Sequence, residues 1–87
     1  MGWRIELSRR AEKQLAAIDA PEVLRIVRYL SELEKLESPR SRGKGLTADL
    51  SGLWRYREGN LRVLCRIEEG RLLVLVVVID HRSTVNN

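Results

Sequence analysis

An uninterrupted apolar run near the C-terminus places the tightest limit on the fold. Residues 72–79 read LLVLVVVI, and most of them are β-branched. A strand of this composition belongs inside a sheet, where both of its faces can be covered. The run passes directly into Asp80, His81 and Arg82. Charged side chains at the end of a rigid strand are held in place, as a reactive site requires.

The N-terminal half predicts one short strand and two helices. Residues 3–7 alternate apolar and polar side chains, as a half-buried strand does. Ser8 is placed to cap a first helix that continues to Ile18, and Pro21 suits the first turn of a second helix that ends before residues 38–39. One face of this second helix should be buried against the core. That face is the apolar stripe of Val23, Ile26, Val27, Leu30 and Leu33.

The C-terminal half alternates with a period of two and predicts three strands. Residues 53–57 and 60–67 form a hairpin around Glu58-Gly59, and residues 71–79 form the last strand. We therefore expect one α+β domain over residues 1–87, with an N-terminal strand and a helical hairpin packed on one face of a mainly antiparallel sheet. The last strand is either flanked by the first strand or covered by a partner on its second face, or both.

Residues 40–52 are rich in glycine, serine and threonine, and are predicted to be a loop. The loop carries Arg40, Arg42 and Lys44, with no acidic residue before Asp49. A solvated linker and a phosphate-binding loop explain this composition equally well.

The hairpin register predicts a cluster of arginines. A turn at Glu58-Gly59 would place Arg55 opposite Arg62, with Arg57 beside them. Guanidinium groups bind phosphate oxygens in a bidentate manner, so this face is a candidate phosphate clamp. The opposite face, toward the helices, would hold Trp54, Tyr56, Leu61, Val63, Cys65 and Ile67.

Composition narrows the class of partner and site. The net charge of +4 favours a polyanionic partner. One Cys and one His disfavour a structural metal site, and Cys65 is expected to be a buried hydrophobic residue. No signal peptide is recognisable and the longest apolar run is too short to span a bilayer, so we expect a cytoplasmic protein that does not associate with membranes.

Two stretches resemble a known family, namely KGLTADLSGLWRYREGNLRVLCRI and VVVIDHRSTV. They are similar to the RelE/ParE superfamily of bacterial type II toxins, on the RelE side. The resemblance implies a ribosome-dependent endoribonuclease that cuts mRNA in the ribosomal A site and is inhibited by a cognate antitoxin. It also implies a reaction without metal or other cofactor, in which the 2′-hydroxyl of the RNA attacks the adjacent phosphate.

The same resemblance assigns roles to individual residues. Arg55, Arg62 and Arg82 stand at catalytic positions of the family, and the expected substrate-binding residues are Lys44, Arg57, His81 and Asn86. Relatives commonly carry a Tyr at the position of Asn86. A carboxamide cannot act as a general base, so either another residue takes that role or the activity of this chain is weakened.

Two other functions fit parts of the sequence. A ParE-like toxin would inhibit DNA gyrase by binding it, without nuclease chemistry, and a plain basic module would only bind nucleic acid. The arginines of the hairpin and the His81-Arg82 ending favour the nuclease, because a gyrase-binding protein does not need that set.

Overall fold

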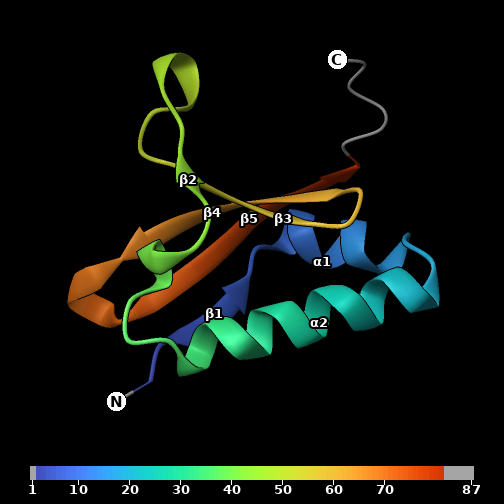
Figure 1. The fold of residues 1–87 in the computed structure, drawn as a ribbon. Helices are drawn as coiled ribbons and strands as arrows, with labels where there is room; N and C mark the ends of the chain where they lie inside the picture. Colours follow the sequence, from blue (N-terminus) through green and yellow to red (C-terminus); the bar gives the residue numbers. More distant parts are fainter. Residues whose placement is uncertain (1, 82–87) are drawn as a thin grey trace.

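Two helices cover one face of a five-stranded sheet in the computed structural model, which describes residues 2–81 (Figure 1). The helices α1 (Arg9–Ala16) and α2 (Ala20–Lys35) run in opposite directions. The strands are β1 (Arg4–Leu7), β2 (Lys44–Gly45), β3 (Trp54–Glu58), β4 (Leu61–Glu68) and β5 (Leu73–His81). Their order is β1-β5-β4-β3-β2, with β1 parallel to β5 and the other pairs antiparallel. The predicted α+β architecture is confirmed.

Three local features differ from the prediction. The loop over residues 40–52 contains β2, which is too short to leave a periodic signal in sequence. Val27, placed in the buried stripe of α2, is 47% exposed, because the helix buries a narrower face made of Ile26, Leu30 and Leu33. The last strand begins at Leu73, because Leu72 adopts a left-handed conformation with φ of 48°. It continues to His81, because β4 pairs with it as far as Leu61.

A β-bulge at Val77 decides which residues of β5 face the helices. Cys65 pairs with Val76 and Leu64 pairs with Val78, so Val77 has no partner on β4. An extra residue in one strand reverses the alternation of side chains beyond it. Val76 before the bulge and Ile79 after it are consequently both buried.

Polar groups of α1 hold this bulge in place. The backbone N–H of Ser8 donates to Val76 O at 2.8 Å, and its hydroxyl donates to Val77 O at 2.8 Å. The Ser8 hydroxyl also accepts from Ala11 N at 3.0 Å, which is the predicted helix cap. The Ile79 N–H donates to Gln14 Oε1 at 2.7 Å. Ser8 and Gln14 therefore satisfy backbone groups of β5 at and beyond Val76, where β1 has ended.

The core lies between the helices and one face of the sheet. Its buried side chains come from α1, α2, β3, β4 and β5, and they are Ala11, Ile26, Leu30, Leu33, Tyr56, Leu61, Val63, Cys65, Val74, Val76 and Ile79. Trp3 and Trp54 pack against this cluster, as expected for core anchors. No helix within residues 2–81 is long and apolar enough to cross a membrane.

The segment before β2 is fastened across β3 by two aromatic side chains. The fully buried Tyr56 donates its hydroxyl to Pro39 O at 2.7 Å, and Trp54 Nε1 donates to Arg42 O at 2.7 Å. Gly43 fits against the strand because it lacks a side chain. A Cβ there would lie 2.5 Å from Arg55 O, and its φ is +82°. This close approach places Lys44 beside Arg55.

Substituting Gly43 tests that fastening. Gly43→Ala would combine the strain of a positive φ, about 1–2 kcal/mol, with overpacking against β3, about 1–3 kcal/mol. Gly52→Ala is a matched control, because Gly52 has a φ of +93° but a Cβ there meets nothing within 4 Å. Denaturant unfolding should show that Gly43→Ala loses more stability than Gly52→Ala. Equal losses would mean that the close packing at Gly43 contributes nothing.

Candidate functional site

The face of the sheet opposite the helices, called here the open face, gathers cations in cross-strand rows. In the first row Lys44 pairs with Arg55, which pairs with Leu64 on β4. In the second row Arg57 pairs with Arg62, which pairs with Asp80 on β5. Arg66 lies on the same face, two residues beyond Leu64 along β4. The cations of β2, β3 and β4 on the open face are Lys44, Arg55, Arg57, Arg62 and Arg66.

The predicted register of the hairpin is wrong, although the predicted faces are right. Arg62 lies opposite Arg57, and Arg55 lies opposite Leu64. The turn consists of Gly59 and Asn60, since Gly59 adopts the left-handed conformation (φ +61°) that the first central position of a tight hairpin turn requires. Glu58 therefore stays in the strand. This shift moves every cross-strand partner by two residues, so each side chain keeps its face.

The cations of the open face differ in how they are balanced. Arg62 NH2 lies 3.9 Å from Asp80 Oδ2, and the side chain of Arg62 is 26% exposed. Lys44, Arg55 and Arg66 form no ion pair with any residue in the range 2–81. The first row therefore offers unbalanced positive charge, while the second row contains its own carboxylate.

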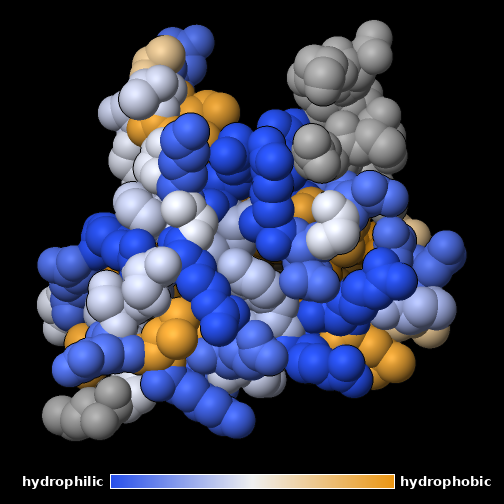
Figure 2. Space-filling model, viewed as in Figure 1, coloured by the Kyte–Doolittle hydropathy of each residue, from blue (hydrophilic) through white to orange (hydrophobic). Residues whose placement is uncertain are grey.

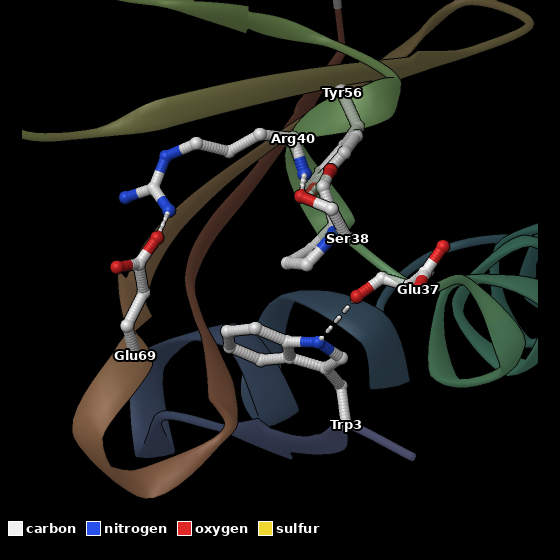
Figure 3. A network of polar contacts seen from close by, with 7 residues as sticks. Trp3, Glu37, Ser38, Arg40, Tyr56 and Glu69 are labelled. Atoms are coloured by element: carbon white, nitrogen blue, oxygen red, sulfur yellow. Dashed lines mark hydrogen bonds and ion pairs between the residues drawn. The ribbon is translucent and has the colours of Figure 1, made fainter. Parts of the chain in front are cut away.

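Two loop arginines take structural roles instead. Arg40 forms an ion pair with Glu69 (Figure 3). Its guanidinium carbon also lies 5.6 Å from the Trp54 ring centroid. Arg42 NH1 contacts Glu32 Oε1 at 3.1 Å. Of the three loop cations, Lys44 is the one that reaches the open face. The loop is thus partly a structural linker and partly a contributor to the candidate site.

A shallow hollow of about 300 Å³ lies beside the first row, where Lys44, Arg55, Arg57 and Gly43 meet Tyr29 of α2. Burial raises the pKa of the Tyr29 hydroxyl, and Arg42, whose guanidinium lies 5.7 Å from the ring centroid, opposes that shift. A phenol with a raised pKa is protonated at neutral pH and can donate a hydrogen bond. The hollow therefore presents donors and positive charge to a ligand.

The thiol of Cys65 and the phenol of Tyr56, both buried between the sheet and the helices, are unreactive. Burial raises the pKa of Cys65 to about 12, so its thiolate is absent at neutral pH. Burial also raises the pKa of the Tyr56 hydroxyl, which already donates its hydrogen bond to Pro39 O. The prediction that Cys65 is a buried hydrophobic residue is confirmed.

The other predicted site residues lie at or beyond the end of β5. The backbone of His81 is the last of the strand and pairs with Leu61. Arg82 and Asn86 lie outside the described residues. Within residues 2–81, no group of three or more His, Cys, Asp or Glu side chains could hold a metal ion.

Sequence reasoning missed two members of the open face. Arg66 has the same parity as Arg62 along β4, and that signal was present in the alternation. Asp80 gave no such signal, because the bulge at Val77 determines its face.

Comparisons with solved structures agree with this fold. The RelBE2 toxin–antitoxin complex of Mycobacterium tuberculosis contains a chain of 24% sequence identity, with a TM-score of 0.86 over 95% of this chain and 94% of that chain. The RelE–RelB complex of Pyrococcus horikoshii gives 22% identity and a TM-score of 0.74, over 94% and 97% of the chains. The isolated RelE toxin of E. coli gives 12% identity and a TM-score of 0.72, over 91% of this chain and 83% of that chain. At these identities the likeness shows the fold alone.

Family membership rests on the sequence itself. No curated protein sequence matches the chain. The family model described as the ParE toxin of the type II toxin–antitoxin system parDE matches residues 5–85. Since that match spans nearly the whole sequence, the protein belongs to the ParE toxin family of type II toxin–antitoxin systems, within the RelE/ParE superfamily.

Proposed function

We propose that this toxin is a ribosome-dependent mRNA endoribonuclease of the RelE type, acting without metal by attack of the RNA 2′-hydroxyl on the adjacent phosphate. The observation that carries the proposal is the open face, where Lys44 and Arg55 form one row and Arg57 and Arg62 form the next. Attack on a phosphodiester concentrates negative charge on the phosphate oxygens, and guanidinium groups stabilise that charge through paired N–H donors.

The roles divide according to position. Arg62 and Arg55 would bind and stabilise the reacting phosphate, while Lys44 and Arg57 would hold neighbouring parts of the RNA backbone. The family resemblance assigns Arg82 to the leaving group and His81 and Asn86 to substrate contacts, and these remain part of the proposal. Cys65 is excluded as a nucleophile, because it is fully buried and its thiolate is absent at neutral pH.

We also propose how the cognate antitoxin inhibits the toxin. Several solved relatives are complexes of RelE with RelB antitoxins. The open face carries cations of the candidate site, so an antitoxin segment with acidic residues would mask the site directly. The half-buried side chains Leu64, Leu75 and Val78 on the same face would add apolar contact area.

Inhibition of DNA gyrase is the second candidate function, and the name of the matching family model favours it. The two functions differ in product. Primer extension on a translated message would map cuts in the A-site codon for the nuclease, whereas a gyrase poison would leave the message intact and produce gyrase-dependent DNA breaks. Breaks without message cleavage would reject the proposed nuclease.

Arg62→Ala should slow cleavage on programmed ribosomes by about 30- to 900-fold while the protein stays folded. Loss of one charge-stabilising donor typically costs roughly 2–4 kcal/mol of transition-state stabilisation. Arg4→Ala is the matched control. Arg4 is an exposed arginine of β1 that also faces away from the helices, and its NH2 lies 3.8 Å from Glu6 Oε2. Unchanged cleavage by a folded Arg62→Ala protein would remove Arg62 from the mechanism.

Asp80 should act as an internal competitor of phosphate for Arg62. Exposed ion pairs contribute about 0.2–1 kcal/mol, so Asp80→Asn should tighten binding of single-stranded RNA by up to about fivefold. Glu6→Gln is the control, because it also removes one negative charge and breaks an ion pair of similar length, with Arg4. Fluorescence anisotropy at several salt concentrations measures both. An equal gain in the two variants would indicate a bulk charge effect and no competition.

Asn86 can be tested although it lies outside the described residues. Asn86→Tyr should raise toxicity in a growth assay, because it adds a stacking ring and a titratable hydroxyl together. Asn86→Phe adds the ring alone, and general-base catalysis is worth about 10²–10⁴-fold, so the two roles separate clearly. If the parent and both variants are equally toxic, this position has no catalytic role in the chain.

A further inference from the structure

A half-enclosed hollow on the open face has no role in the function proposed above. The segment over residues 46–53, called here the arm, connects β2 to β3 and rises from the sheet on the side away from the helices (Figure 1). The Leu46 N–H donates to Leu53 O at 3.0 Å and closes the arm at its base. Between the arm and the sheet lies a hollow of about 450 Å³, called here the arm hollow. That volume is within the range of small-ligand sites.

The lining of the arm hollow combines apolar and polar groups. Leu50, Leu53 and Val77 contribute apolar surface, and Leu50 is 48% exposed. Figure 2 shows hydrophobic surface on the arm, at the upper left of the view, next to strongly hydrophilic residues. The polar members are Asp49, Ser51 and Arg66, which supply an acceptor, a hydroxyl and a cation. A flat ring with a polar edge and an apolar face fits such a lining better than a bare anion does.

The arm hollow lies in line with the cation rows. Arg66 is two residues along β4 from the first row and four from the second. At about 3.3 Å per residue, these offsets are about 7 and 13 Å. An extended strand of RNA that places its phosphates on the rows can therefore bring a base to the arm hollow. Arg66, which has no ion-pair partner within residues 2–81, could contact the adjoining phosphate.

We propose that the arm hollow is a nucleobase subsite, which binds one base of a single-stranded RNA whose backbone lies on the cation rows. The inference rests on the nuclease function proposed above. Bases of a duplex are stacked and paired, whereas single-stranded RNA can turn a base out into a protein pocket. The Asp49 carboxylate only accepts hydrogen bonds, so the subsite favours a base with an exocyclic amino group over uracil.

Synthetic messages on programmed ribosomes test the subsite. Each message carries one abasic nucleotide, placed in turn at each position of the decoding-site codon and its flanks. The protein should lose about fivefold to tenfold in cleavage rate at one position, which is the lower end of the discrimination that hydrogen bonds to a base edge provide. In messages with intact bases, uracil at that position should be cut more slowly than cytosine, and Asp49→Asn should reduce this difference.

Two arm variants separate the arm hollow from the rest of the arm. Ser51→Trp fills the hollow and should make cleavage insensitive to the abasic position. Thr47→Trp adds the same bulk to an exposed arm residue that does not line the hollow, and should keep the sensitivity of the parent. Thermal melting of each variant checks folding.

The possible failures are distinguishable. If the parent protein cuts no message, the proposed nuclease function fails and the subsite fails with it. If the parent cuts intact messages but no abasic position matters, or Ser51→Trp behaves like Thr47→Trp, the subsite alone is wrong.

Discussion

The bulge in β5 is the constraint on which the rest of the structure depends. A strand with strict alternation would turn Ile79 away from the helices and bury the charge of Asp80, an unfavourable exchange. The extra residue at Val77 reverses the alternation at the point where the sequence changes from apolar to charged. Ser8 and Gln14 of α1 bind the backbone around it, so the helix layer and the charge pattern of the opposite face are set by the same contacts. A continuous apolar run suits a bulged interior strand, because even-numbered residues face the core before the bulge and odd-numbered residues face it after the bulge.

The fold was predictable wherever a single element carries its own signal. The cap at Ser8, the second helix and the assignment of each hairpin residue to a face all follow from local residue patterns. The register did not follow, because a change of two residues leaves every face unaltered and gives no hydrophobic signal against it. The conformation of Gly59 selects the turn, and with it the partner of Arg62. Sequence parity therefore placed Arg55, Arg57 and Arg62 on one face, but did not show which of them are opposed.

The remaining features of the site depend on contacts between distant parts of the chain. The face of Asp80 depends on a bulge that eight consecutive apolar residues conceal. The arm hollow exists because a segment with ordinary turn composition stands over Arg66 and Val77, far along the chain. The positive charges also differ by position. Arg40 and Arg42 form ion pairs with Glu69 and Glu32 at the periphery. On the open face, Lys44, Arg55 and Arg66 form no ion pair with any of the described residues. Positive charge is thus left available on the open face.

The buried thiol of Cys65 can also serve as a natural probe of local opening in the protein. Cys65 lies on β4 between β3 and β5, with no exposed surface. A reagent can reach its sulfur only when the core between the helices and the sheet opens, and its raised pKa keeps it unreactive until then. The rate of thiol labelling in the native protein therefore measures the frequency with which the core around Cys65 opens. As the chain has no other cysteine, that rate can be assigned to one place without engineering a probe.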